Sequence, residues 1–348
     1  MFLLLLDQLL VVSGANSTWE KSDSKDDSEI RIRLDSESED EILVASEDDP
    51  TWEMLDSEII SLHERKQTKW ICAFGQQGMT GCINSDGKII LIGGETFDEF
   101  FQMRGTKKCW IYDNIRSSFP ERIKMLEKRA WSSSTLLYNE LIWIVGGKSY
   151  GLGLCSTELL DIHSGKSKRG KNLPFTIKSH CTVEYNEHSL YIIGGLQNEE
   201  ASRETWIVNP EKDFEIAKGP SLKFARFSHS CGKMELDGEV VLIVAGGYDD
   251  EEALNSVEIL RPNKTEEGWI WGPDLPCKMY DSCMVTSFDG KGVILIGGFD
   301  STNNRVSDSM LEMHSLHGMN WKVLDTRLKH GRKGHVVLTT SSDKCQTK

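Results

Sequence analysis

The sequence predicts an all-β chain built from a repeated unit of about fifty residues. The first glycines of successive Gly-Gly pairs lie 53, 48, 52 and 51 residues apart. A short run of Ile, Leu and Val precedes each pair, too short for a helix and suited to a strand buried on both faces. A fixed period of this length with four-strand units is typical of a β-propeller. The five pairs are Gly93-Gly94, Gly146-Gly147, Gly194-Gly195, Gly246-Gly247 and Gly297-Gly298.

The elements within each unit follow one order. After the glycine pair come a polar loop, an alternating strand such as residues 256–262, and a strand or turn with Trp or Pro, as in residues 269–276. A basic or His-bearing segment, such as Arg226 to His229, leads into the next apolar run. Glycine at a strand end permits positive φ and close backbone approach, so we expect the pairs to be structural.

This order of elements resembles the kelch repeat over roughly residues 78–340. We expect a six-bladed kelch β-propeller whose last blade is shared between the N- and C-termini. Residues 332–342 would supply its first strand, residues 41–56 an apolar run with Ala45-Ser46 in place of the glycines, and KWICAF (69–74) its fourth strand. Such a seam protects against open strand edges. Cys72 and Cys345 would lie at this seam, where we expect a disulfide.

Charge is concentrated in the N-terminal region. The chain has a formal net charge of −14, and residues 16–66 hold 17 acidic and 6 basic side chains. The remainder is almost neutral, so nucleic acid, which needs a basic surface, is excluded as a partner. Residues 16–40 are rich in Ser, Asp and Glu, a composition that favours disorder. We therefore expect the propeller domain to cover residues 41–348.

The first fifteen residues resemble a signal peptide, with an apolar stretch too short to span a bilayer. No basic residue precedes the stretch and Asp7 interrupts it, so a cytoplasmic location stays open as the alternative. The nine cysteines favour secretion without proving it. Cys82, Cys181, Cys231 and Cys283 occupy near-equivalent positions in different blades, and we interpret them as small buried hydrophobic residues. We expect a secreted monomer without a membrane span.

Motifs for catalysis, metal ions or cofactors are absent from the sequence. Metalloprotease, nucleophile-elbow and phosphate-loop patterns do not occur, and no Cys-x-x-Cys spacing supports zinc. We therefore expect no enzymatic activity, no metal and no cofactor. Some kelch propellers are enzymes, among them sialic-acid mutarotases of similar size. Arg129, Arg226 and His180 could imitate the lining of their central channel, which leaves a small-sugar enzyme as one alternative.

The resemblance also implies a binding face at one mouth of the propeller. In kelch proteins that capture partners, this mouth is built from the loops after each Gly-Gly pair and the loops before each inner strand. Arginine and aromatic side chains are frequent binding hot spots. The arginines match positions that relatives present to acidic ligands, although a structural ion pair is the competing role of each. The candidate partner-binding residues are Arg129, Trp131, Tyr150, His180, Arg226, His229, Tyr248, Tyr280, Phe299 and Arg332.

The function expected from the sequence is a non-enzymatic module that binds a protein or peptide through this mouth, and an acidic ligand is one candidate. An intracellular substrate adaptor or actin-associated kelch protein is a further alternative. Fewer than fifty residues precede the first expected strands, which leaves no room for a BTB, BACK or F-box domain.

Overall fold

The computed structural model describes residues 51–57, 68–74, 77–97, 103–113, 121–287, 289–328 and 330–341, and Trp52–Lys348 forms one compact unit. The described part is almost entirely β, apart from the short 3-10 helices η1 (Pro210–Lys212), η2 (Pro262–Glu267) and η3 (Ser315–His317). The expected signal peptide 1–15, acidic segment 16–40 and apolar run 41–46 lie outside the described residues. The expectation of an all-β chain is confirmed.

The main sheets are antiparallel and are numbered here as sheets 1 to 6. Sheet 1 contains β3 (Met79–Ile83), β4 (Ile89–Gly93), β6 (Met103–Tyr112), β5 (Glu95–Phe97) and β7 (Glu121–Arg129). Sheet 2 contains β8 (Ser133–Leu137), β9 (Leu141–Val145), β12 (Thr157–Asp161) and β13 (Lys166–Arg169). Sheet 3 contains β15 (Cys181–Asn186), β16 (Ser189–Ile193), β19 (Thr205–Asn209) and β20 (Glu215–Lys218).

Sheets 4 and 5 repeat the same meander. Sheet 4 contains β21 (Ser230–Leu236), β22 (Glu239–Ala245), β23 (Val257–Leu260) and β24 (Ile270–Trp271). Sheet 5 contains β26 (Cys283–Thr286), β27 (Gly292–Ile296), β30 (Met310–His314) and β31 (Trp321–Val323). Sheet 6 joins β1 (Thr51–Ser57) and β2 (Thr68–Phe74) to β32 (Val336–Ser341).

Short strands form small additional sheets in the loops around the glycine pairs. β10 (Lys148–Ser149) pairs with β11 (Leu152–Gly153). β17 (Leu196–Gln197) pairs with β14 (Ile177–Lys178) and β18 (Glu200–Ala201), and β28 (Phe299–Asp300) pairs with β25 (Met279–Tyr280) and β29 (Arg305–Val306). These small sheets hold the loops of neighbouring main sheets together.

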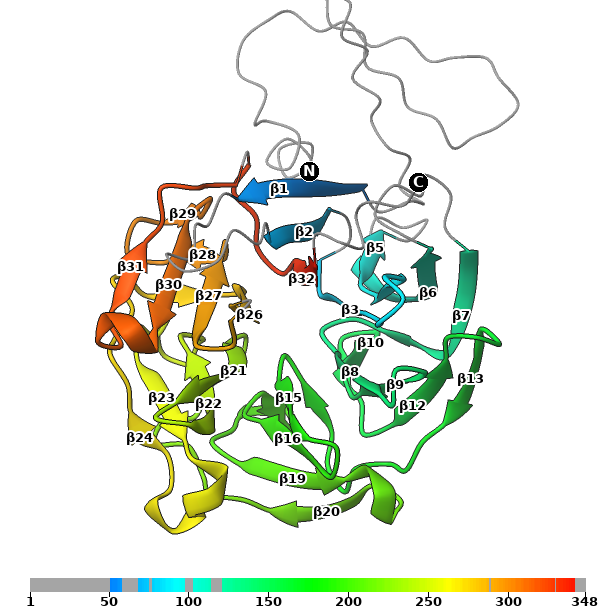
Figure 1. The fold of residues 1–348 in the computed structure, drawn as a ribbon. Coiled ribbons are helices and arrows are strands. Elements are labelled where there is room, and N and C mark those ends of the chain that lie inside the picture. Colours follow the sequence, from blue (N-terminus) through cyan, green and yellow to red (C-terminus); the bar gives the residue numbers. More distant parts are fainter. Residues whose placement is uncertain are drawn as a thin grey trace, which may run out of the picture. The chain divides into compact units, whose positions relative to one another are not determined.

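The first strands of the main sheets face a common centre (Figure 1). Each contacts the first strand of the next sheet, in the cycle β3, β8, β15, β21, β26 and β32, and β32 in turn contacts β3. Apolar clusters fill the space between neighbouring sheets. Ile90 and Ile92 of sheet 1, for example, pack with Ile142 and Ile144 of sheet 2, all fully buried. This sandwiching explains why the second strands are continuous apolar runs.

The glycine pairs form the junctions between consecutive sheets. The second glycine of each pair donates its N–H to a carbonyl in the loop before the next sheet, at 2.7–3.0 Å. The first glycine faces the same carbonyl so closely that a Cβ would lie 2.3–2.6 Å from its oxygen. Both glycines have positive φ in every pair. The accepting residues are Arg129, Ile177, Arg226, Met279 and Arg332.

A glycine substitution can separate backbone strain from steric conflict. Gly246 has φ +64° and a Cβ there would lie 2.3 Å from the Met279 carbonyl oxygen, whereas Gly238 has φ +76° with open space around it. We expect Gly238→Ala to lower the free energy of unfolding by about 1–2 kcal/mol through its left-handed φ alone. Gly246→Ala should lower it by clearly more. Equal losses in urea denaturation would contradict the junction role of the pair.

Sheet 6 differs from its expected strand order. The segment 69–74 was expected to be the fourth strand, but β2 lies between β1 and β32 and pairs directly with β32, for example Cys72 with Val337. That expectation was wrong. The physical reason is visible in Trp70 to Phe74, a continuous apolar run without a Gly-Gly pair, which suits the second position of a sheet. The sequence prediction identified second strands by their Gly-Gly pairs, and this strand has none.

A disulfide joins Cys181 of β15 to Cys231 of β21, in neighbouring sheets, with 6.1 Å between the Cα atoms. Our interpretation of these two cysteines as simple buried hydrophobic residues was therefore wrong. Their positions on adjacent first strands bring them together although 50 residues separate them in the chain. The expected Cys72–Cys345 bridge involves side chains outside the described residues and stays a prediction.

Reduction of this disulfide should destabilise the protein. Closing a loop of 50 residues restricts the unfolded chain, and such bridges contribute about 2–4 kcal/mol. We expect dithiothreitol to lower the melting temperature of the native protein. A Cys181→Ala/Cys231→Ala variant should melt at the reduced temperature with or without the reductant. A reductant effect that persists in the double variant would assign the stabilisation to another bridge.

No helix in the described part of the chain is long and apolar enough to cross a membrane.

Candidate functional site

A closed cycle of main-chain hydrogen bonds surrounds the centre of the molecule. Six residues, each one or two positions before a first strand, have φ between 50° and 70°. Each donates its N–H to the carbonyl of the member before it at 2.8–2.9 Å, and the first donates to the last at 2.9 Å. We call this set the axial ring. Its members are Gly78, Trp131, Ser179, Ser228, Asp281 and Gly334.

The indole of Trp131 lies across two members of the axial ring. A Cβ added at Gly78 would be 2.8 Å from indole atoms, and one at Gly334 would be 3.0 Å from the indole. The Trp131 indole therefore fits over the two members of the axial ring that have no side chain. Trp131 itself adopts a left-handed φ of 55°, an unusual conformation for a bulky residue that points to a functional constraint.

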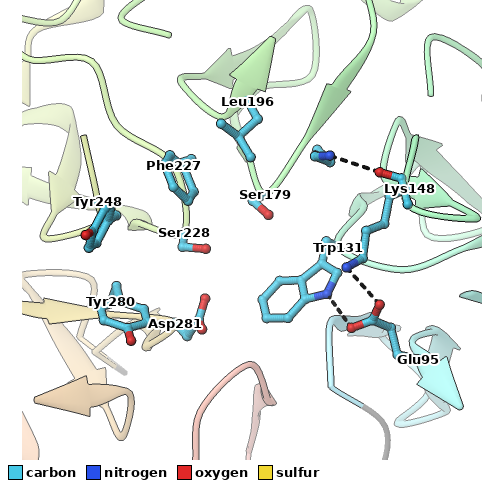
Figure 2. A pocket seen from close by; sticks show the side chains of 12 residues that line it. Glu95, Trp131, Lys148, Ser179, Leu196, Phe227, Ser228, Tyr248, Tyr280 and Asp281 are labelled. Atoms are coloured by element: carbon cyan, nitrogen blue, oxygen red, sulfur yellow. Dashed lines mark hydrogen bonds and ion pairs between the residues drawn. The ribbon is translucent and has the colours of Figure 1, made fainter. Parts of the chain in front are cut away.

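Two charged side chains hold Trp131 in place (Figure 2). Its Nε1 donates to Glu95 Oε2 at 2.9 Å, and Lys148 Nζ pairs with Glu95 Oε1 at 2.8 Å. Lys148 Nζ also lies 6.0 Å from the indole centroid. Glu95 is only 6% exposed, so both of its oxygens are engaged in a site with little water. These contacts consequently fix the orientation of the Trp131 side chain.

A pocket of about 600 Å³ opens beside the axial ring, and we call it the mouth pocket. Its size falls in the range of small-molecule sites, which combine aromatic walls with a few polar groups. The ring members Trp131, Ser179, Ser228 and Asp281 line one part of it (Figure 2). The side chains that line it also include Glu95, Lys148, Lys178, Leu196, Phe227, Tyr248 and Tyr280.

Asp281 is the carboxyl group of the pocket whose protonation is most perturbed. Burial raises its pKa above the usual range, while the Ser228 side chain and the charge of Lys333 oppose this rise. Its Oδ1 is buried and has no hydrogen-bond partner among the described residues. A buried carboxyl with a raised pKa in a pocket is a candidate acid–base group.

Aromatic rings form a row along one side of the mouth pocket. The centroids of Phe227 and Tyr248 lie 5.7 Å apart, those of Tyr248 and Tyr280 5.9 Å, and those of Tyr280 and Phe299 5.2 Å. Lys333 Nζ lies 5.2 Å from the Phe299 centroid. The predicted binding residues Tyr248, Tyr280 and Phe299 are thus brought together; Tyr248 and Tyr280 line the mouth pocket with Trp131 and Asp281, and Phe299 continues the row from Tyr280.

Two of the predicted arginines lie in the interior instead. Arg129 and Arg226 have fully buried side chains, and each pairs with a buried glutamate, Glu158 at 3.1 Å and Glu258 at 2.7 Å. Both also donate to the carbonyl of the first glycine in the sheet that follows them, Gly146 at 2.7 Å and Gly246 at 2.8 Å. Arg332, at the corresponding position, is buried as well. These contacts favour the structural role that competed with partner binding.

Neighbouring sheets fill the same two positions with apolar side chains. Ile177 precedes its ring member by two residues, as Arg226 does, and packs in one cluster with Trp206. Met279 and Leu311 form the corresponding pair in sheet 5 and belong to one apolar cluster. The junction therefore accepts either a buried ion pair or a hydrophobic pair, which shows why arginine is missing from two blades.

The predicted histidines are also interior residues. His180 and His229 are 7% exposed, and burial lowers the pKa of each, and of His335, to about 3. Neither ring nitrogen of His180 or His335 has a hydrogen-bond partner in the described part of the chain. They pack beside the glycine junctions, where His229 lies near Gly194. These side chains are neutral packing groups at physiological pH.

Tyr150 is the predicted residue that stands apart from the aromatic row. It is 60% exposed in the turn between β10 and β11. Arg104 and Lys128 each lie 5.2 Å from its ring centroid. Its neighbour Gly151, not Tyr150 itself, lines the mouth pocket.

Sequence reasoning placed Glu95 and Lys148 in loops of the binding face and noted Asp281 beside Tyr280, but it selected none of the three as a candidate binding residue. Glu95 and Lys148 directly follow glycine pairs, and Asp281 lies two residues before the first strand β26. Comparing the equivalent position of each repeat, one or two residues before the first strand, would have found the axial ring. Among the described residues no group of His, Cys, Asp or Glu could hold a metal ion.

The fold is that of a kelch-like β-propeller. The solved structure of YjhT, a sialic acid mutarotase with this fold, is similar with a TM-score of 0.59 and 10% sequence identity, over 76% of this chain and 89% of YjhT. The spermatocyte protein spe-26 of Caenorhabditis elegans is 22% identical over 192 residues, which is 55% of this chain. The chain spans about a third of that relative's length, since the match covers 32% of it. No family model matches the chain.

The similarity to YjhT corrects one expectation from the sequence. We expected no enzymatic activity, but the mutarotase YjhT has a propeller of the same kind, and this finding overturns that expectation. At 10% identity the likeness itself extends to the fold. The expected imitation of a mutarotase channel by Arg129, Arg226 and His180 also differs from the structure, since all three are buried away from the mouth pocket.

Proposed function

We propose that the mouth pocket binds a small sugar and exchanges its anomers by proton transfer at Asp281. The observation that carries this proposal is that one pocket of about 600 Å³ is lined by the Asp281 carboxyl, a candidate acid–base group, together with aromatic faces and hydroxyls. Aromatic faces suit the apolar face of a sugar ring, and Ser179 and Ser228 offer hydroxyls at the ring. The sialic acid mutarotase YjhT shares the fold and makes this chemistry the first to test.

The reaction needs only proton transfers. The Asp281 carboxylate accepts the proton of the anomeric hydroxyl as the bond between the anomeric carbon and the ring oxygen breaks. Water in the pocket protonates the ring oxygen, and the open-chain aldehyde or ketone forms. Closure from the opposite face of the carbonyl reverses both transfers, so no oxidant or other reactant is required.

The test is the rate of anomer exchange, followed by NMR exchange spectroscopy. We expect the protein to accelerate exchange for at least one sugar of a panel of aldohexoses, hexosamines and N-acetylneuraminate. Asp281→Asn should lower that acceleration about 10²-fold or more. Asp237→Asn, on a largely exposed turn, is the matched control and should have no effect. Equal rates with and without protein for every sugar would refute the proposal.

Binding of a protein or peptide at the same mouth is the second candidate, favoured by the row of half-buried aromatic rings. A pull-down with the native protein and a Tyr248→Ala/Tyr280→Ala variant tests it. A partner retained by both proteins would exclude the row as the binding surface.

For the whole chain we propose six blades, with the sixth formed by both termini. The six-membered axial ring, the cycle of contacts between first strands and the pairing of β2 with β32 support this arrangement. We also propose a secreted monomer with a cleaved leader at residues 1–15 and an acidic segment at 16–40, and the Cys181–Cys231 disulfide fits an oxidising compartment. N-terminal sequencing of protein from the medium tests the leader.

A further inference from the structure

The lysines that line the mouth pocket already have carboxylate partners. Lys148 pairs with Glu95 at 2.8 Å, and Lys178 pairs with Glu199 while also donating to the Gly151 carbonyl at 3.1 Å. Arg129 and Arg226 are engaged in the interior. An acidic ligand would therefore have to compete with an existing carboxylate for every one of these cations.

The carboxylate of Asp281 stands in the opposite situation. It lines the pocket, and the Ser228 side chain hydrogen-bonds to it, but its Oδ1 is buried without a hydrogen-bond partner among the described residues, and no ion pair to it is seen there. Lys333 influences it through space but lies over the rings of Phe299 and Tyr280, at 5.2 and 6.0 Å from their centroids. A buried carboxylate oxygen without a donor is energetically unfavourable until a donor or cation reaches it.

Aromatic faces of the same mouth already hold cations. Lys148 lies over Trp131 and Lys333 over Phe299, both within the range of cation–π attraction. The Asp281 carboxylate, the Trp131 indole and the Tyr280 ring line one pocket, with Trp131 and Tyr280 on either side of Asp281 (Figure 2). An ammonium group in that space would meet a negative charge and π faces together, the combination by which proteins recognise organic cations.

We propose that the mouth pocket binds small organic cations in preference to acidic sugars. Among sugars, the expected ligand is an amino sugar with a protonated amine. This proposal rests on the proposed function in one respect: both take the mouth pocket as the ligand site. The ammonium group contacts Asp281, and the carbon skeleton lies against Trp131 and Tyr280. This ligand differs in charge from the acidic partner expected from the sequence.

The experiment measures dissociation constants by isothermal titration calorimetry on the full chain at neutral pH. The probes are glucosamine, glucose, N-acetylneuraminate and tetramethylammonium. We expect glucosamine to bind at least tenfold more tightly than glucose, tetramethylammonium to bind detectably, and N-acetylneuraminate to bind more weakly than glucose. In Asp281→Asn the preference for glucosamine over glucose should fall to about twofold or less, while Asp237→Asn keeps it.

The outcomes separate the two proposals. Selective binding of glucosamine without accelerated anomer exchange would refute the enzymatic proposal and leave this one standing. The proposal of cation selection would be overturned by tighter binding of N-acetylneuraminate than of glucosamine, or by absence of glucosamine binding at millimolar concentration. It would also be overturned if folded Asp281→Asn kept the preference for glucosamine over glucose. The wild-type ranking of the four probes decides the question even if that variant does not fold.

Discussion

Replacing Arg226 by methionine should lower the free energy of unfolding by about 3–5 kcal/mol, because it leaves Glu258 buried without its cation. Both side chains are 0% exposed, and Arg226 Nη2 donates to Glu258 Oε1 at 2.7 Å. Glu258 also accepts the backbone N–H of Lys223 at 2.7 Å and of Phe224 at 3.2 Å, so it fixes the loop before sheet 4. Urea denaturation measures the loss.

Sheet 5 supplies the matched double variant. Met279 and Leu311 occupy the positions that correspond to Arg226 and Glu258. Since a buried ion pair exchanged for a packed apolar pair is often neutral, Arg226→Met/Glu258→Leu should recover at least half of the single-variant loss. If the double variant is as unstable as the sum of both single variants, the ion pair makes no coupled contribution and the explanation fails.

Mild acid should destabilise the protein through its buried histidines. The buried His180, His229 and His335 keep a pKa of about 3 when folded, whereas unfolded histidine has a pKa of 6.5. Below 6.5 the unfolded chain therefore binds protons that the folded chain does not. Each histidine then lowers the free energy of unfolding by about 1.4 kcal/mol per pH unit as pH falls from 6.5 toward 3.

The measurement is urea denaturation between pH 6.5 and 5. The three histidines together predict a slope of about 4 kcal/mol per pH unit at the lower end of this window. His229→Ser introduces the residue that Ser132 and Ser282 place at the same position in other sheets, and it should reduce the slope by about a third. The slope is compared rather than the stability, because the smaller side chain also leaves a cavity. An unchanged slope would mean that His229 is not buried in its neutral form.

Several features of the fold followed from the sequence. The continuous runs of Ile, Leu and Val, such as Ile89 to Ile92, required strands covered on both faces, and each lies between neighbouring sheets. The glycine pairs had to be glycine because both members adopt positive φ against a neighbouring carbonyl. Tyr248, Tyr280 and Phe299 were assigned to one mouth from their place in the repeat, and the structure brings them into one row.

The burial of the arginines could not be read in the same way. Arg129 and Arg226 occupy loop positions typical of exposed recognition residues, and only their approach to Glu158 and Glu258, some thirty residues away, removes them from the mouth. The Cys181–Cys231 disulfide depends likewise on the offset between two adjacent first strands. Local patterns hold no information about such contacts.

The sequence by itself determined the strands, their period and the positions of the junctions, because these depend on local hydrophobicity and on backbone angles that glycine alone tolerates. The tertiary structure decided which side chains face the mouth and which are buried between the sheets. The axial ring turns Asp281 and Trp131 inward, whereas the sheets enclose Arg129, Arg226 and His180. The physical reason is that charge and burial at the mouth are set by contacts between residues some thirty to fifty positions apart in the chain.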